Sequence, residues 1–111
     1  MDKINEFLKK NYTEHTINGL NGPVYFPDAT KRLKCTDGFN ISVQANEFTY
    51  CTPRKNKAWP YSCVELGFPS MLDELIQDFA EDENTCETVF GYVPIDIVNK
   101  LIEKHGGIEN F

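Results

Sequence analysis

One stretch of the sequence combines residue types that bind nucleotides. Tyr50-Cys51-Thr52-Pro53-Arg54 runs on through Trp59-Pro60-Tyr61, so one arginine, one tryptophan and two tyrosines surround a single loop. A guanidinium presents a planar fork of donors that suits phosphate or carboxylate, and aromatic rings offer faces on which a base stacks. The same pattern also fits a hairpin tip in water, with Arg54 and Lys57 solvated and Trp59 packed on a sheet. Composition alone leaves both interpretations open.

The two histidines do not form a recognisable catalytic group. His15 lies in a turn or at a strand start, and His105 lies at a predicted helix C-terminus, where a cation favours the helix dipole. A hydrolytic triad needs a nucleophile, a base within reach and an orienting acid, and the sequence has no Gly-x-Ser-x-Gly elbow. Gly106-Gly107 follows a helix, whereas a phosphate cradle precedes one. We therefore predict a binding protein and not an enzyme.

The residue types that bind metal ions do not have the sequence spacing of known metal sites. The cysteines stand at positions 35, 51, 63 and 86 without CxxC spacing, which argues against a structural zinc site. Glu81-Asp82-Glu83 lacks the alternating oxygen ligands of an EF-hand loop and favours a solvated helix end. No secretory signal precedes the first helix, so we interpret the cysteines as reduced thiols of a cytosolic protein. We expect neither a metal nor a cofactor.

Length and charge narrow the possible partners. The chain has 111 residues, which predicts a single domain over 1–111, and 41% of them are hydrophobic, enough for one core. A formal net charge of −6 argues against a nucleic-acid groove, which needs a clustered basic stripe. No apolar run approaches the length of a membrane span. A domain this small gains buried area by oligomerisation, so a homo-oligomer is compatible with the sequence.

The apolar periodicity predicts an α+β fold. A helical period predicts helices over 2–12, 70–79 and 94–104, the second capped by Ser70 and the third opened by Pro94. Between residues 15 and 68 the period changes to two, and Asp37-Gly38 is a strong hairpin signal. We expect an antiparallel meander of about five to six strands, flanked by an N-terminal helix and two C-terminal helices. The expected strands cover 24–26, 32–35, 41–45, 48–52, 61–68 and 89–93.

Several strings, in their order along the chain, resemble one family. They are Gly38-Phe39-Asn40-Ile41-Ser42-Val43-Gln44-Ala45, the Tyr50–Arg54 string, Val64-Glu65-Leu66-Gly67-Phe68-Pro69-Ser70, Tyr92-Val93-Pro94 and Ile102-Glu103-Lys104-His105-Gly106-Gly107-Ile108. The pattern resembles small proteins of phages and prophages, and among these the first type of Thoeris anti-defence protein. The likeness extends from about residue 11 to residue 108.

The resemblance implies a function. Proteins of this family act in the host cytoplasm as sponges: they sequester glycocyclic ADP-ribose, the signal that bacterial TIR enzymes make on infection, without degrading it. The family fold is an antiparallel sheet flanked by helices. Its members form dimers or larger assemblies with ligand pockets at subunit junctions, and some also hold cyclic oligonucleotides. No catalytic base is required for such a role.

The resemblance also implies binding residues. Arg54 matches a pocket arginine, Phe79 matches an aromatic residue that stacks on adenine, and Asn84 is a weaker match to a polar pocket residue. A basic residue of the last helix also contacts ligand in the family, and Lys100 and Lys104 are both possible matches, Lys104 being our choice. Trp59 completes the predicted set because it lies in the aromatic loop. By its spacing, Phe79 is equally a core residue of its helix.

A second function remains open. The acidic charge fits a protein-binding inhibitor, such as an anti-CRISPR protein that covers the basic groove of a nuclease. Acidic residues gathered on one exposed face would favour this alternative, and a deep pocket that contains Arg54 would count against it. A third possibility is a phage accessory or structural domain without a ligand.

Overall fold

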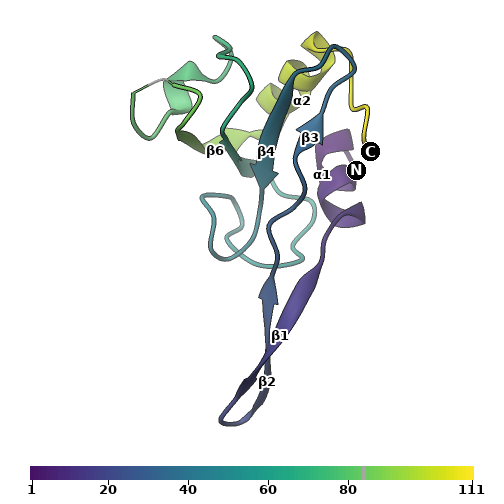
Figure 1. The fold of residues 1–111 in the computed structure, drawn as a ribbon, viewed down its shortest axis with the longest axis vertical. Coiled ribbons are helices and arrows are strands. Elements are labelled where there is room, and N and C mark those ends of the chain that lie inside the picture. The colour runs from purple at the N-terminus through teal and green to yellow at the C-terminus, as the bar shows by residue number, and fades with distance from the viewer. Residues whose placement is uncertain (84) are drawn as a thin grey trace.

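Two antiparallel sheets and two α-helices form the structure. The computed structural model describes residues 1–83 and 85–111 (Figure 1). In chain order its elements are α1 (Lys3–Lys10), β1 (Glu14–Gly19), β2 (Gly22–Pro27), β3 (Leu33–Lys34), β4 (Asn40–Gln44), β5 (Cys63–Gly67), the 3-10 turn η1 (Gln77–Phe79), β6 (Val89–Pro94) and α2 (Ile95–Lys104). Strands β1 and β2 pair only with each other, and β3-β4-β5-β6 form the second sheet in sequence order. The predicted α+β class with about six strands is confirmed.

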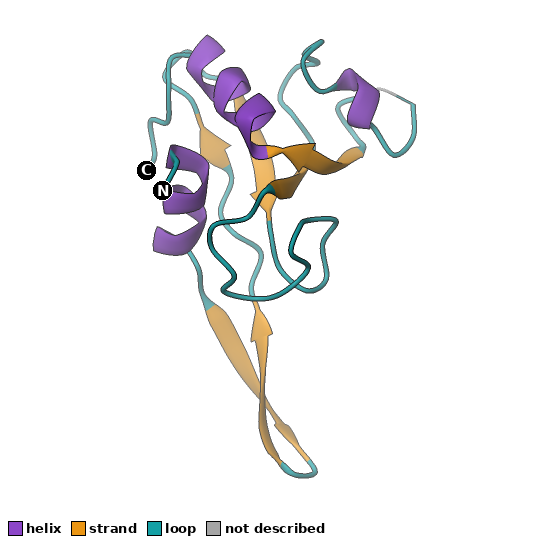
Figure 2. Cartoon of the chain, turned by 180° about the vertical axis from the view of Figure 1, so that it is seen from behind, coloured by secondary structure: helices purple, strands orange, loops and turns teal. Residues whose placement is uncertain are grey.

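One face of the four-stranded sheet carries the core. Ile41, Val43, Val64 and Leu66 alternate along β4 and β5 and are fully buried. They belong to one hydrophobic cluster with apolar residues of α1 and α2, so both helices cover the same face. The other face of the sheet has no helix on it among the described elements (Figure 2). Ser42, Gln44 and Glu65 on this face, which we call the open face, are partly exposed.

Both helices begin where the sequence predicted. The Asp2 carboxylate accepts a hydrogen bond from the Asn5 N–H at 3.0 Å, which caps α1. Pro94 stands immediately before α2, and the helix ends in two glycines whose φ angles are both 91°. The N–H of Gly107 donates to the carbonyl oxygen of Ile102 at 2.9 Å. Only glycine adopts this left-handed conformation without strain, so the pair closes α2.

The helix expected over 70–79 is reduced to a single 3-10 turn. Ser70, the expected cap, instead pairs with the start of β4, because its hydroxyl accepts from the Asn40 N–H at 3.0 Å. The Asp73 carboxylate accepts from the Leu75 N–H at 3.0 Å and turns the chain early. Leu72, which a regular helix over 70–79 would place on the same face as Phe79, is 46% exposed. A tertiary bond at Ser70 and a local bond at Asp73 therefore replaced the helical ladder that the periodicity predicted.

The strand expected over 48–52 is a turn. Asn46 and Thr49 satisfy the backbone locally: the Asn46 side chain accepts from the Phe48 N–H at 2.8 Å, and the Thr49 hydroxyl accepts from the Asn46 N–H at 2.9 Å. Such bonds compete with a strand ladder. Only Thr52 forms an isolated bridge, with Cys63 of β5. The loop before Arg54 is therefore held at the end of β5 without being part of the sheet.

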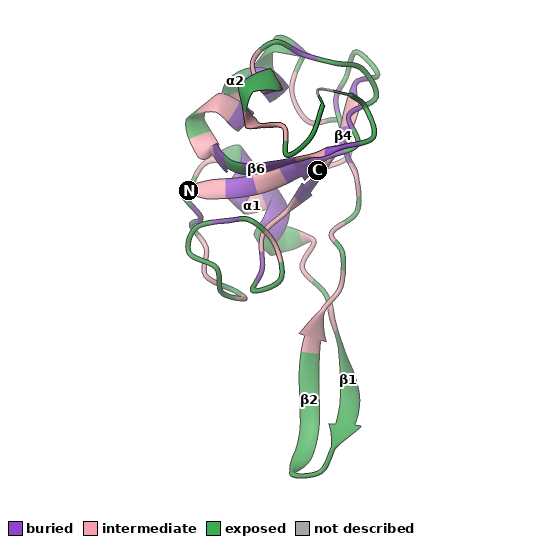
Figure 3. Cartoon of the chain, turned by 90° about the vertical axis from the view of Figure 1, so that its left-hand side faces the viewer, coloured by how far each residue is buried: buried purple, intermediate pink, exposed green. Residues whose placement is uncertain are grey.

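The β1–β2 hairpin projects away from the rest of the protein. It forms the narrow lower end of the molecule in Figure 1, and Figure 3 shows it mostly exposed. Gly19 and Gly22 flank a two-residue loop, and Leu20 at the tip is fully exposed. We call this hairpin the arm. It gives the molecule a length of 47 Å against 29 and 21 Å in the other directions.

The four cysteines differ in their burial. Cys35 and Cys51 are buried, Cys63 is partly buried and Cys86 is exposed. Neither α1 nor α2 is long and apolar enough to cross a membrane, and this holds for every helix in the described ranges.

Candidate functional site

Strands β5 and β6 pair irregularly at their middle. The register shifts between Val64 and Leu66, so Glu65 alone faces both Gly91 and Tyr92. Two residues opposite one form a β-bulge, which bends the strand and turns a side chain outward. Tyr92 has a φ of 51°, and its N–H donates to a carbonyl oxygen of the preceding loop at 3.0 Å. A tyrosine in this left-handed region is strained, and such strain concentrates at functional sites.

The bulge presents a pair of tyrosines beside Arg54. The carbonyl group that Tyr92 contacts belongs to Tyr50, and the two rings lie 5.8 Å apart. Both rings are partly open to solvent, with 39% of Tyr50 and 46% of Tyr92 exposed. The Arg54 guanidinium lies 5.4 Å from the centre of the Tyr50 ring, a cation–π distance. We call Tyr50, Arg54 and Tyr92 the bulge surface.

Arg54 is exposed, and most of its N–H donors make no hydrogen bond with the described residues. Its Nε donates to the carbonyl oxygen of Glu47 at 3.2 Å, and its two terminal NH2 groups have no acceptor among the described residues. Beneath the loop, the buried Tyr61 hydroxyl accepts from the Ala58 N–H at 3.1 Å and donates to the Lys55 carbonyl group. The buried Tyr61 side chain thus fixes the backbone of the loop at Lys55 and Ala58. The arginine is oriented by its neighbours but not neutralised by a carboxylate.

Two carboxylates border the bulge surface. Glu65 accepts from the Tyr50 N–H at 3.4 Å, and burial raises the pKa of its carboxyl group above the ordinary value, although that bond and Arg54 act in the opposite direction. Glu81 also raises this pKa by its charge, and its carboxylate lies where a side chain on Gly91 would stand. The site therefore offers cationic donors and anionic acceptors side by side, and it suits a ligand with both phosphates and hydroxyl or amino donors.

A hollow of about 280 Å³ lies on the open face of the sheet and shares Glu65 with this site. We call it the sheet-face hollow. Polar side chains of β4 form part of its lining, and the rings of Phe48 and Phe68, 58% and 50% exposed, are also part of it. The residues lining it are Pro27, Ala29, Ser42, Gln44, Asn46, Phe48, Thr49, Glu65, Gly67, Phe68 and Val89. Its volume is at the lower end for small-molecule sites, so one copy covers a nucleotide only in part.

The predicted aromatic residues pack against the core, and among the described residues the cation–π contact of Arg54 is with Tyr50 and not with either of them. Trp59 packs edge-to-face on Tyr12, with ring centres 5.4 Å apart, and is half-buried. Phe79 is half-buried in η1 and packs against the hydrophobic cluster. The segment after η1 lies along β6, because Ala80 forms a bridge with Phe90. Phe79 is thus near the strand of the bulge, whereas Trp59 lies beside α1. Their contacts with a ligand stay predictions.

The predicted basic residues other than Arg54 lie on α2. Lys104 forms an ion pair with Asp73, Nζ to Oδ2 3.0 Å, at the far end of α2. Lys100 is exposed on the same helix. Asn84 lies outside the described residues. The structure therefore spreads the described members of the predicted set over several elements, and of these members Arg54 is the one that belongs to the bulge surface.

His105, Asp37, Asp73 and Lys104 form one group of interacting ionisable side chains, which we call the Asp73 cluster. Its Nδ1 lies 2.7 Å from Asp37 Oδ2 and its Nε2 lies 3.2 Å from Asp73 Oδ2, and its ring stacks on Phe39 at 4.0 Å. Burial raises the pKa of Asp73, but hydrogen bonds from the Leu75 N–H, Lys104 and His105 outweigh it and lower that pKa below its ordinary value. The cluster joins the end of α2 to the β3–β4 turn, which is a structural role. Within the described ranges, no group of three or more His, Cys, Asp or Glu is placed to hold a metal ion.

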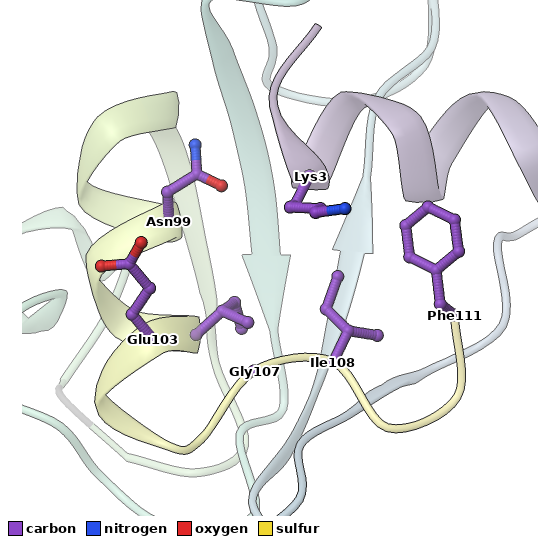
Figure 4. A pocket seen from close by; sticks show the side chains of 7 residues that line it. Lys3, Asn99, Glu103, Gly107, Ile108 and Phe111 are labelled. Atoms are coloured by element: carbon purple, nitrogen blue, oxygen red, sulfur yellow. The ribbon is translucent and has the colours of Figure 1, made fainter.

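A second cavity, of about 260 Å³, lies between the helices and the C-terminal tail (Figure 4). Apolar side chains of Ile102, Ile108 and Phe111 line it, with Lys3 and Glu103 at its edge. The Phe111 ring also packs edge-to-face on Phe7 at 6.3 Å, and the Lys10 ammonium lies 4.8 Å from its centre. None of the residues predicted to bind ligand lines this cavity.

Comparison of the chain with protein-family models, curated proteins and solved structures gave no match. The site is therefore described from its own geometry. Sequence reasoning selected Arg54 and noted Tyr50 as an aromatic residue of the same loop, but it missed Tyr92, Phe48 and the face of the sheet. The strand pattern gave no signal for Tyr92, because a bulge breaks the alternation on which strand prediction depends.

Proposed function

We propose that the protein is a phage-type sponge that binds and sequesters a cyclic ADP-ribose-type nucleotide, glycocyclic ADP-ribose, and thereby blocks Thoeris immunity without degrading the signal. The nucleotide binds over the open face of the four-stranded sheet, with its diphosphate at Arg54. The proposal combines the resemblance of the sequence strings with the chemistry of the bulge surface.

The observation that carries the proposal is the arrangement of Arg54 over Tyr50. A guanidinium with both terminal NH2 groups available binds a diphosphate through charge-assisted hydrogen bonds, each contributing about 1.5–3 kcal/mol. The rings of Tyr50 and Tyr92 stand next to it and offer faces for stacking, which contributes about 1–3 kcal/mol per base. A sponge needs a nanomolar Kd, about −12 kcal/mol. Two such bonds and one stacked base contribute about 4–9 kcal/mol, so the remainder has to come from enclosure of the ligand by further contacts.

The carboxylates beside Arg54 fit the other groups of the ligand. Glu65 and Glu81 only accept hydrogen bonds when ionised, so they suit ribose hydroxyl groups and the amino group of adenine. Phe48 and Phe68 provide apolar contact at the hollow. A second copy of the chain, or a larger homo-oligomer, would close the open side of the ligand and exclude water from these contacts.

Isothermal titration of the protein with glycocyclic ADP-ribose tests the proposal. We expect tight one-step binding, and we expect the intact nucleotide to be recovered after heat denaturation. The absence of binding to this and other cyclic nucleotides would contradict the proposal. Recovery of a chemically altered nucleotide would indicate an enzyme instead.

One observation favours the second candidate, an inhibitor that covers a basic protein surface. The sequence has no lysine or arginine from residue 58 to residue 99, and the segment around η1 carries six exposed acidic residues: Glu74, Asp78, Glu81, Asp82, Glu83 and Glu87. Such a surface attracts a basic groove. Replacing Glu81, Asp82 and Glu83 by their amides would abolish that interaction. In the sponge proposal, Asp82→Asn and Glu83→Gln together leave nucleotide binding unchanged.

A further inference from the structure

The arm has one edge closed to strand pairing and one edge open. In an antiparallel pair, residues alternate between positions whose N–H and C=O groups point at the partner strand and positions whose groups point outward. At the base of the arm, where it joins the rest of the protein, the N–H of Asp28 donates to the carbonyl oxygen of Thr13 at 3.0 Å. Counting from this pair, the register places the backbone groups of residues 14, 16 and 18 of β1 and 23, 25 and 27 of β2 outward.

Prolines occupy the outward positions of β2. Pro23 and Pro27 lack an N–H, so of the three outward donors only that of Tyr25 remains on this edge. Proline at such positions is the usual device against edge-to-edge association. On the β1 edge, Glu14, Thr16 and Asn18 all retain their N–H groups, and these have no backbone partner within the described residues. One edge of the arm is therefore protected and the other is available.

The β1 edge is complementary to itself. When two β1 strands pair antiparallel about a two-fold axis at Thr16, Thr16 faces the same residue of the second copy, and Glu14 of each copy faces Asn18 of the other. All three pairs are of the hydrogen-bonded kind, which gives about six backbone hydrogen bonds. The Asn18 amide donates, and the Glu14 carboxylate accepts beyond its present bonds to Tyr12 and Lys57.

The charge of the arm also favours a second copy. Residues 16–27 include no Asp, Glu, Lys or Arg, although the whole chain has a net charge of −6. The proposed contact adds one acidic residue from each copy, Glu14, and Lys57 forms an ion pair with it, so two arms meet with less repulsion than other faces would produce. Ile17 and Val24, 53% and 44% exposed on one face of the arm, gain cover from the second hairpin. A hairpin of two strands alone is only marginally stable in water, and a four-stranded sheet removes that weakness.

The geometry points to a second copy of this chain as the partner of the arm: two copies pair along β1, centred on Thr16, and join their arms into one four-stranded sheet. This interface does not depend on the proposed ligand, and it forms without it. It also lies close to the loop of Arg54, because Lys57 of that loop forms an ion pair with Glu14 of β1, Nζ to Oε2 3.1 Å.

Two matched proline substitutions test the edge. Thr16→Pro removes an outward N–H from the open edge, and Tyr25→Pro removes the one directly opposite, on the closed edge. Neither N–H contributes to pairing within the hairpin. Sedimentation velocity without nucleotide should give a dimer for the natural chain, a dimer Kd about thirtyfold weaker for Thr16→Pro because two symmetric bonds are lost, and no change for Tyr25→Pro. Circular dichroism verifies that each variant is folded.

A cysteine pair tests the register. In a chain carrying Cys86→Ser, which removes the exposed native thiol, Thr16→Cys should oxidise to a covalent dimer. The facing Cα atoms of a hydrogen-bonded pair are about 5.5 Å apart, within the range of a disulfide. Asn18→Cys should stay uncoupled, because the two Asn18 residues are about 13 Å apart in this register.

Each part of the proposal, the dimer and its register, can be contradicted separately by these experiments. A monomeric natural chain at all concentrations overturns the proposal, and so does a dimer that Thr16→Pro leaves intact or that Tyr25→Pro weakens equally. Coupling through Asn18→Cys and not through Thr16→Cys overturns the register. The sponge can fail independently, since a protein that dimerises as expected but binds no cyclic nucleotide contradicts only the proposed function.

Discussion

At the scale of single residues, the two interpretations of the loop differ in what they predict for a substitution of Arg54. Its side chain is exposed, and its one protein hydrogen bond goes through Nε to a backbone carbonyl oxygen. An arginine that stabilised the fold would be buried or paired with a carboxylate. The exposed guanidinium is compatible with both interpretations, a residue that binds ligand and a solvated hairpin tip. Only a substitution separates the two.

We expect Arg54→Ala to weaken binding of glycocyclic ADP-ribose by at least about a hundredfold, because two charge-assisted bonds are lost. Its free energy of unfolding should stay within about 0.5 kcal/mol of the natural value, as for other exposed side chains. Titration calorimetry and thermal unfolding measure the two effects. Exposed Lys55→Ala in the same loop is the matched control and should bind normally. A large fall in Tm for Arg54→Ala would assign the residue to the fold.

Asp73 predicts a dependence of stability on pH. Its carboxylate is buried, and its pKa is lower in the folded protein than the ordinary 3.8. Folding therefore favours the ionised form, so the contribution is present above that value and is lost as the pH falls through the folded pKa. Asp73→Asn should lower the free energy of unfolding at neutral pH by about 1–3 kcal/mol. Urea unfolding should show this difference shrinking as the pH falls below about 3.8, and a difference constant with pH would be incompatible with the assignment.

At the scale of elements, the sequence predicted the parts whose local signals agree with the tertiary structure. The cap at Asp2, the turn at Asp37-Gly38 and Pro94 before α2 are such signals, and the elements beside them are where they were predicted. The helix over 70–79 failed because Ser70 and Asp73 found tertiary partners, in β4 and His105, that no periodicity reveals. Single-sequence patterns describe one element at a time, so they omit bonds formed between elements.

The same limit applies to the candidate site. Its arginine could be selected from residue type, but the sheet-face hollow is made by residues from 27 to 89 that only the fold brings together. The bulge was also beyond prediction, because it depends on the pairing of β6 with β5. Trp59 shows the converse: its type suggested a ligand, whereas its edge-to-face packing on Tyr12 shows a structural contact.

The bulge itself gives a prediction. A methyl group at residue 91 would collide with the Glu81 carboxylate and lie 3.2 Å from Tyr50 Cβ. Since the carboxylate is the end of a flexible side chain, we expect Gly91→Ala to lower the free energy of unfolding by only about 1 kcal/mol. Nucleotide binding should fall more than this, because the Tyr50 ring and Arg54 move with it. Unchanged affinity, measured by titration with exposed Lys55→Ala as the control, would remove the bulge surface from the site.

At the scale of the whole molecule, shape and charge are both uneven. The Cα radius of gyration is 14.3 Å, more than the roughly 13 Å of a compact chain of this length, because the arm extends beyond the core. Basic residues are confined to the first 57 positions and to Lys100 and Lys104. The arm therefore carries no formal charge over residues 16–27, and the segment around η1 is acidic. The bulge surface and the carboxylates beside it carry charges of both signs.

Small-angle scattering checks this shape. If two copies pair through overlapping β1 strands, the dimer should be elongated, with a longest dimension of roughly 70 Å, against 47 Å for one copy. Shortening the arm by removing residues 16–25 should return the scattering to that of a compact monomer. A dimer no longer than about 50 Å would mean that another surface joins the copies.

The central claim is that a cyclic nucleotide binds on the open face of the sheet at Arg54. Amide chemical shifts of the isotope-labelled protein, followed by NMR during titration with glycocyclic ADP-ribose, test it most directly. The account predicts the largest changes at Tyr50, Arg54, Glu65 and Tyr92, with those of Asn99 and Phe111 at the helix-side cavity unmoved. Changes centred on that cavity, or none at saturating nucleotide, would contradict it.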